Sequence, residues 1–193
     1  MEYLDEKILE IKNKRRREQQ ELQGQVNIGG TLYEITTFTF FNGKIRIKLP
    51  KEFTDMPPAF AKLKYPAEQR PQIIKMNEDG SINLTLSLYP EKLKETDVFE
   101  CISGLKTVIE RVNPANLFFE LKVAESPEVT VGYFEFKSNA IDSDLYNIMF
   151  VTPIEGQTLL GTFNCRFSDR EDWKPVALQL IMSIRDLTKP TNQ

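Results

Sequence analysis

The stretch Leu145–Pro153 reads LYNIMFVTP, and its centre, YNIMFV, is apolar at neighbouring positions rather than at every second one. A strand points successive side chains to opposite faces of its sheet. A strand that is apolar on both faces is typical of a sheet that is covered on both sides. The stretch therefore predicts a sheet with a layer of structure against each face.

The segments around this stretch predict further strands. Short polar links separate it from the β-rich runs NLFFELKV, VTVGYFEFK and TLLGTFNCRF, which together indicate an antiparallel meander. Nearer the N-terminus, Asn42-Gly43 separates two β-rich runs, and this dipeptide favours a hairpin because both residues tolerate positive φ. A second hairpin is predicted at QIIKM–NEDG–SINLTLSLY.

Three segments predict helices. A short one follows Asp55, the expected N-cap, and ends by Tyr65 because Pro66 disfavours helical geometry before it. A long one is indicated by an apolar stripe at helical spacing, followed by Asn113-Pro114: Val98, Cys101, Ile102, Leu105, Val108, Ile109 and Val112. The last is expected to begin near Asp172, after a capping box of Ser168 and Glu171, with Trp173 covering the end of the core.

These elements predict an α+β fold: a largely antiparallel sheet of about seven or eight strands, sandwiched by two long helices and one short one. Residues 25–193 are expected to form a single α/β/α sandwich domain. Residues 1–24 are expected to form a charged helical arm with a narrow apolar stripe, Leu4, Ile8 and Ile11. The run Arg15–Arg17 could contact nucleic acid or anionic lipid, but a solvated face or an arm that docks on a protein is favoured.

The composition excludes several chemistries. The 193 residues contain no histidine, which rules out Ser-His-Asp and Cys-His catalysis and every zinc site that needs histidine. The two cysteines, Cys101 and Cys165, are expected to be reduced, and no cofactor or metal is predicted. The net charge of −3 argues against nucleic-acid binding, and the lack of a long apolar run argues against stable membrane insertion. A cytoplasmic location is expected, because no secretory signal is visible.

Two groups of residues are candidates for partner binding. The first lies in the proline-bracketed stretch KYPAEQRPQIIK, where Tyr65, Glu68 and Arg70 form either a structural corner, the favoured interpretation, or a recognition loop. The second consists of small or polar residues expected on one sheet face, which would form a shallow groove if no helix covers it: Thr130, Gly132, Asn147, Thr162 and Asn164.

The order of elements, with the phrases FNGKIRIKLPKEFTDMP, YPAEQRPQIIK, YNIMFVTP and GTFNCRFSDREDWKPVALQLIMSI, resembles the PsbP-like α/β/α fold, in particular its bacterial DcrB-like branch. The resemblance spans roughly residues 32–187 and includes no catalytic signature. It implies a non-enzymatic module, since relatives include chaperones of secreted antibacterial effectors that shield apolar helices of their cargo. The charged N-terminal arm departs from the family pattern.

Three functional hypotheses follow. The first is a cytoplasmic, non-enzymatic protein-binding accessory, chaperone or adaptor, tied to a secreted toxin or a secretion system. The second is a small enzyme that uses carboxylates with Tyr or Lys, for example around Tyr65, Glu68 and Arg70; it predicts a polar pocket there, whereas an Arg70 held by a backbone carbonyl would argue against it. The third is a scaffold that oligomerises through residues 1–24. The oligomeric state is left open.

Overall fold

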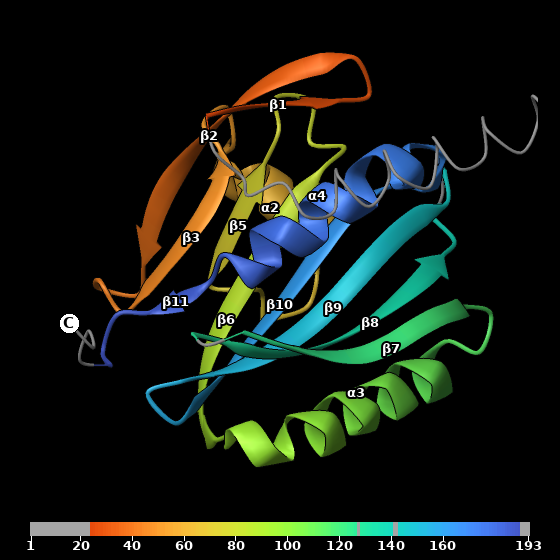
Figure 1. The fold of residues 1–193 in the computed structure, drawn as a ribbon. Helices are drawn as coiled ribbons and strands as arrows, with labels where there is room; N and C mark the ends of the chain where they lie inside the picture. The colour runs from red at the N-terminus through yellow and green to blue at the C-terminus, as the bar shows by residue number, and fades with distance from the viewer. Residues whose placement is uncertain (1–23, 127, 141–142, 190–193) are drawn as a thin grey trace, which may run out of the picture.

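The structure is a computed structural model that describes residues 24–126, 128–140 and 143–189. The predicted arm, residues 1–24, lies outside these residues except for Gly24. Two antiparallel sheets and three helices make up the described part of the chain (Figure 1).

The strands form a seven-stranded sheet in the order β4-β5-β6-β10-β9-β8-β7 and a four-stranded sheet in the order β1-β2-β3-β11. The strands of the larger sheet are β4 (Thr54–Asp55), β5 (Ile73–Met76), β6 (Asn83–Lys92), β7 (Leu117–Glu125), β8 (Thr130–Ser138), β9 (Leu145–Ile154) and β10 (Gln157–Arg166). Those of the smaller sheet are β1 (Gln25–Ile28), β2 (Thr31–Phe40), β3 (Ile45–Pro50) and β11 (Arg185–Asp186).

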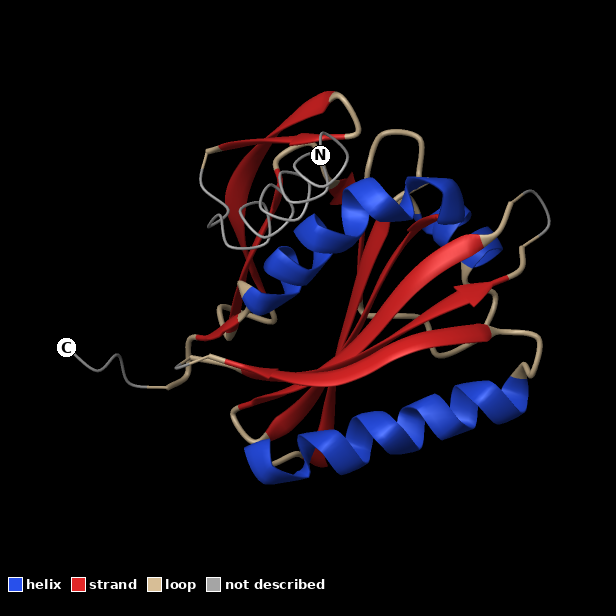
Figure 2. Cartoon of the chain, turned by 45° about the vertical axis from the view of Figure 1, so that its right-hand side comes forward, coloured by secondary structure: helices blue, strands red, loops and turns tan. Residues whose placement is uncertain are grey.

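The helices are α2 (Pro58–Lys64), α3 (Val98–Val112) and α4 (Arg170–Met182), and the 3₁₀ turns η1 (Glu95–Asp97) and η2 (Phe167–Asp169) precede the last two. Figure 2 shows the larger sheet between α3 on one side and α4 on the other. The predicted α+β class, the antiparallel sheet and its position between helices are confirmed.

The position of α3 follows from the strand order. The chain leaves β6 in the middle of the sheet and must reach β7 at its edge, four strand spacings away, or about 19 Å. A helix of 15 residues is about 22 Å long, which is enough for this crossing. The helix consequently packs on β7, β8 and β9.

The larger core lies on the α4 face. It brings together Ile45, Ile47 and Leu49 of β3 with Phe150 of β9 and Phe163 of β10. Trp173 closes its end as predicted, only 4% exposed and in ring contact with Tyr33, Phe53 and Phe163. A smaller core lies under α3: Val98, Ile102, Phe134, Phe136 and Val151.

The predicted hairpins are confirmed. Asn42 and Gly43 both have positive φ, 55° and 87°, in the turn that joins β2 to β3. This hairpin belongs to the four-stranded sheet, whose separateness from the larger sheet the sequence did not reveal. The second hairpin joins β5 to β6 as expected. The two cysteines are free, as predicted.

Two predicted helix starts are wrong. The N-cap of α2 is Pro57, whereas Asp55 lies in β4 and pairs with Lys75 at 2.9 Å. The last helix begins at Arg170 rather than near Asp172, because η2 leads directly into it. Ser168 donates a hydrogen bond to the Asp169 carboxylate (2.8 Å) and does not cap the helix.

Candidate functional site on the α3 side of the sheet

The five candidate residues of the sheet share one face. The register pairs Asn164 with Asn147, Thr162 with Met149 and Gly132 with Val151, and paired residues point to the same side. Thr130 lies two residues before Gly132 on β8 and points the same way. Because Val151 belongs to the core under α3, this is the face that α3 covers.

The condition for a groove, a face without a covering helix, is not met where α3 lies. A Cβ atom added at Gly132 would lie 2.7 Å from a Val98 methyl group and 3.0 Å from Ile102, so the helix rests directly on this glycine. Gly132 therefore serves the close approach of α3 to the sheet. Thr130, Asn147 and Asn164 are buried as well, and Thr162 alone among the five is half-buried.

Beyond α3, the same face carries a row of buried asparagines. Asn83 of β6, Asn164 of β10 and Asn147 of β9 occupy directly paired positions on adjacent strands. Asn83 donates from Nδ2 to Asn164 Oδ1 and to the Gly80 carbonyl, both at 3.0 Å. Asn147 donates to Ser138 Oγ at 2.9 Å. Amide groups replace apolar contacts at this end of the sheet.

Tyr65 joins this row from the loop after α2. Burial raises the pKa of its hydroxyl, and the adjacent Asn164 side chain partly opposes this effect. The structure therefore brings Tyr65 together with Asn164, although the two segments are far apart in the sequence.

Glu68 and Arg70 remain exposed in the same loop. The Arg70 Nε donates to the Tyr65 carbonyl at 2.8 Å, and the Arg70 amide donates to the Glu68 carbonyl at 3.1 Å. A guanidinium held by a backbone carbonyl is the contact expected of a structural corner. Neither side chain joins the asparagine row through a hydrogen bond or ion pair between described residues.

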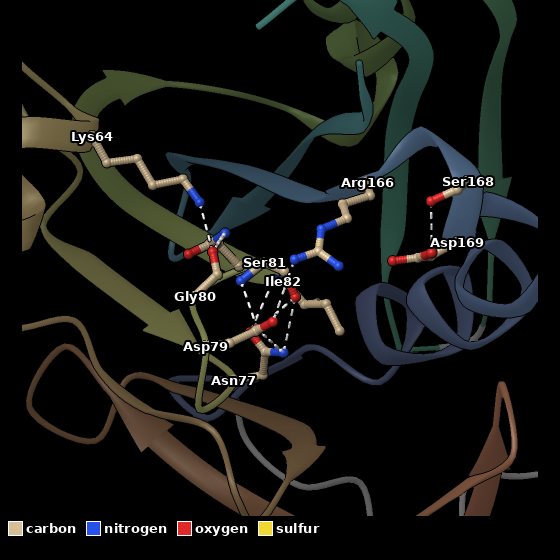
Figure 3. A network of polar contacts seen from close by, with 10 residues as sticks. Lys64, Asn77, Asp79, Gly80, Ser81, Ile82, Arg166, Ser168 and Asp169 are labelled. Atoms are coloured by element: carbon tan, nitrogen blue, oxygen red, sulfur yellow. Dashed lines mark hydrogen bonds and ion pairs between the residues drawn. The ribbon is translucent and has the colours of Figure 1, made fainter. Parts of the chain in front are cut away.

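The turn between β5 and β6 borders the row with a second polar network (Figure 3). Asp79 Oδ1 accepts from the Asn77 amide (2.7 Å), the Ser81 hydroxyl (2.6 Å) and the Ser81 backbone N–H (3.0 Å). These donors, the Ser81 hydroxyl foremost, lower the pKa of Asp79. Sequence reasoning identified NEDG as a turn but did not foresee this network, which its Asn-x-Asp-Gly-Ser pattern could have indicated.

The helix α2 contacts that turn through Lys64 and Phe60. Lys64 Nζ donates to the Gly80 carbonyl at 2.8 Å, and a Cβ at Gly80 would lie 2.7 Å from the Phe60 ring. Gly80 also has positive φ, 71°. Both the close Phe60 ring and this backbone conformation therefore favour glycine at the position. None of the residues of α2 is buried.

Five of the nine large hydrophobic side chains that are exposed in the described residues lie on the helices α2 and α3. They are Phe60 and Leu63 on α2 and Phe99, Val108 and Val112 on α3; the others are Leu32, Tyr89, Leu117 and Leu187. Sequence reasoning counted Val108 and Val112 with the apolar stripe of α3. The helix buries Val98 and Ile102 but leaves those two 54% and 77% exposed.

The opposite face holds a charged cluster that sequence reasoning missed. Glu135 of β8 is 0% exposed, with its carboxylate 2.8 Å from Lys174 Nζ of α4 and accepting from the Tyr146 hydroxyl at 2.7 Å. Burial and the Glu135 contact raise the pKa of Tyr146 well above its usual range. The signal in the sequence was a glutamate in the middle of the otherwise apolar run GYFEF.

Neither side of the sheet carries a metal-binding arrangement: no group of three or more Cys, Asp or Glu suited to a metal ion occurs within residues 24–126, 128–140 and 143–189. In the same ranges, no helix has the length and apolar character to cross a membrane.

Comparisons with known proteins identify the fold. No family model and no curated protein matches the chain. The cyanobacterial PsbP (CyanoP) from Synechocystis sp. PCC 6803 aligns over 82% of this chain and 95% of its own, with 9% identity and a TM-score of 0.59. The Ran-binding protein Mog1p of Saccharomyces cerevisiae aligns over 80% of this chain and 96% of its own, with 9% identity and a TM-score of 0.52.

A protein from Bacteroides thetaiotaomicron VPI-5482 also shares the fold, with 10% identity and a TM-score of 0.53 over 89% of this chain and 51% of its own. The PsbP-like fold inferred from the sequence is confirmed. Membership of the DcrB-like branch stays a prediction. At these identities the likeness concerns the fold alone.

Proposed function

We propose that the protein is a non-enzymatic, protein-binding accessory module and that its docking surface is the layer formed by α2 and α3. The observation that carries the proposal is the exposure of apolar side chains on both helices, including Leu63 of α2 at 78% and Val112 of α3 at 77%. Exposed apolar side chains that gather on one side of a protein are typical of a binding surface.

The chemistry of the surface suits an apolar or amphipathic segment of a partner. Phe60 of α2 and Phe99 of α3 offer aromatic area, and Val108 and Val112 are one helical turn apart. A partner helix laid across them would bury its own apolar stripe there. Such binding requires no bond making or breaking by the protein.

The family resemblance supports a more specific form of the proposal: a cytoplasmic chaperone or adaptor of the DcrB-like type that holds an apolar helix of a secreted effector. Mog1p is by its name a Ran-binding protein, an example of a protein-binding surface on this fold. The Arg70–Tyr65 carbonyl contact also speaks against catalysis around Tyr65, Glu68 and Arg70.

The test is affinity capture from the native cell extract with three forms of the full chain. We expect the wild type and a Leu32→Glu control to recover the same dominant partner, since Leu32 is 57% exposed but lies on β2. The Leu63→Glu/Val112→Glu variant should lose it. Equal recovery by all three forms, or no specific partner for any, would overturn the proposal, as would turnover of a small-molecule substrate.

A further inference from the structure

The helix α4 is apolar on two opposite sides. The side that packs into the larger core consists of Trp173, Val176, Ala177, Leu180 and Ile181. At about 100° per residue, the side chains that lie opposite to these form a second apolar row, the outer stripe of α4: Pro175, Leu178 and Met182. From Trp173 to Met182 the only charged residue is Lys174, which pairs with Glu135 of the sheet. A helix that is apolar on all sides is typical of one that is covered on all sides.

The outer stripe is also less exposed than an uncovered helix side in the same molecule. No residue from Trp173 to Met182 is exposed, whereas Val108 and Val112 of α3 are 54% and 77% exposed. Contact with the larger core accounts for part of the burial of Leu178 and Met182. Figure 1 shows α4 with the larger sheet behind it and no described strand or helix in front of it. Chain outside the described residues is therefore the candidate for the remaining cover.

Residues 1–23 join the described part of the chain beside α4. They precede β1, which packs on α4, and a Cβ atom at Gly29, just after β1, would lie 3.1 Å from the Asp172 carboxylate of α4. The chain from Gly29 back to Gly24 spans about 17 Å when extended, and α4 is about 20 Å long. Residues 1–23 would span about 34 Å even as a continuous helix, so they are long enough to reach α4 and run along it.

The sequence of this segment contains an apolar row that matches the outer stripe. Leu4, Ile8 and Ile11, the arm stripe, recur at helical spacing, and Leu4 and Ile11 are as far apart in the sequence as Pro175 and Met182. Most of the residues around the arm stripe are charged. A narrow apolar row on an otherwise charged segment suits packing against one other helix.

We propose that residues 1–23 dock on α4 of their own chain, with the arm stripe against the outer stripe. Attachment to the same chain favours this occupant over a separate partner, because the tether keeps its effective concentration near α4 high. The docked segment closes the α4 side of the molecule and leaves α3, on the other side of the larger sheet, available. The proposal therefore does not rest on the proposed function.

Met182 gives a direct test, because peroxide oxidises accessible methionines to sulfoxides and peptide mass spectrometry follows each methionine separately. In the full chain, Leu4→Glu/Ile8→Glu should raise the oxidation rate of Met182 several-fold. Met149, half-buried under α3, is the internal reference and should keep its rate. The control variant Asn13→Glu/Gln20→Glu adds the same charge away from the arm stripe and should leave Met182 as slow as in the wild type. Equal Met182 rates in all three forms, or equal rises in both variants, would overturn the proposal.

A second measurement uses the wild type and does not depend on the folding of a variant. Nuclear Overhauser contacts between methyl groups of the arm stripe and those of Leu178 or Met182 are expected by NMR. In a sample mixed from labelled and unlabelled chains, these contacts should arise within one chain. Contacts between differently labelled chains would show that the arm of a second copy covers α4, and this result or the lack of any contact would overturn the proposal.

Discussion

The two faces of the larger sheet each bury a polar cluster, and the clusters differ in charge. The α3 face holds neutral amides, Asn83, Asn147 and Asn164, whereas the α4 face holds the ion pair of Glu135 and Lys174. A buried amide that lacks one hydrogen bond costs about 1–3 kcal/mol, but an unpaired buried charge costs considerably more. An incomplete contact therefore costs less on the neutral face, whereas the buried Glu135 charge needs the countercharge that Lys174 supplies.

This difference separates the roles of the faces. The charged cluster has a fully buried acid, a Lys174 side chain that is 28% exposed, and a fully buried Tyr146, so it fastens α4 to the sheet. The amide row lies beside a helix without buried residues and under a layer with exposed apolar side chains. The ion pair of Glu135 and Lys174 holds α4 against one face, and the proposed binding surface lies on the other.

The largest expected effect comes from breaking the ion pair. Lys174→Met keeps the length of the side chain but leaves the Glu135 carboxylate buried without its countercharge, and we expect a loss of about 3–5 kcal/mol in the free energy of unfolding. Urea denaturation measures this. Adding Glu135→Gln should recover most of the loss, because no unpaired charge remains.

Glu120→Gln is the control for that experiment, since Glu120 lies 3.9 Å from Lys174 but its side chain is 46% exposed. We expect a change of about 0.5 kcal/mol or less. If Lys174→Met proved as mild as Glu120→Gln, the contrast between the two faces would not hold.

Alanine substitutions at two glycines, one on each face of the larger sheet, compare how tightly the two faces are packed. A Cβ at Gly161 would lie 2.1 Å from the Phe150 ring on the α4 face, and one at Gly132 would lie 2.7 Å from Val98 on the α3 face. We expect each Gly→Ala variant to lose about 1–3 kcal/mol of stability, with Gly161→Ala the worse, because overpacking displaces buried groups.

Gly104→Ala on α3 is the matched control, because a Cβ there meets nothing within 4 Å. Alanine is the better helix former, so this variant should gain up to about 1 kcal/mol in thermal or urea unfolding. A Gly132→Ala protein as stable as Gly104→Ala would mean that α3 does not press on the sheet as described.

The smallest effect concerns the turn beside the amide row. The pKa of Asp79 is lowered in the folded state, so its stabilising contribution is present above the pKa of the unfolded chain and disappears as the pH falls through the lower, folded value. Hydrogen bonds to a charged group are worth about 1.5–3 kcal/mol, but the Asp79 side chain is 56% exposed, so we expect Asp79→Asn to cost about 1 kcal/mol at pH 7.

The difference between Asp79→Asn and wild type should shrink toward zero below the folded pKa of Asp79, as followed by unfolding free energies across acidic pH. Glu78→Gln, a change in the adjacent exposed carboxylate, should show no such trend. A difference that stayed constant with pH would show that the Asp79 charge does not support the turn.

Much of the fold could be predicted because its signals are local. The alternation of Ile82, Leu84 and Leu86 with Asn83 and Thr85 indicated both the strand and its two faces, and the structure confirms it. The predictions of a helix start at Asp55 and at Ser168 were wrong because residues that cap helices are also common in turns. Asp55 lies in the short strand β4, and Ser168 lies in the 3₁₀ turn η2.

The candidate site was predictable only in part. The register that places Thr130, Gly132, Asn147, Thr162 and Asn164 on one face follows from strand alternation, but the helix that covers Gly132 does not. Which face α3 covers depends on the strand order, in which β10 lies between β6 and β9. That order is a long-range choice without a local sequence signal.

The sequence by itself determined the α+β class, the antiparallel hairpins and the absence of histidine chemistry, because composition and periodicity act over neighbouring residues. The tertiary structure alone decided that Tyr65 meets Asn164, that Lys174 neutralises Glu135, and that Val108 and Val112 stay exposed. Each of these depends on how segments distant in the chain are placed together, and burial and pairing are properties of that placement.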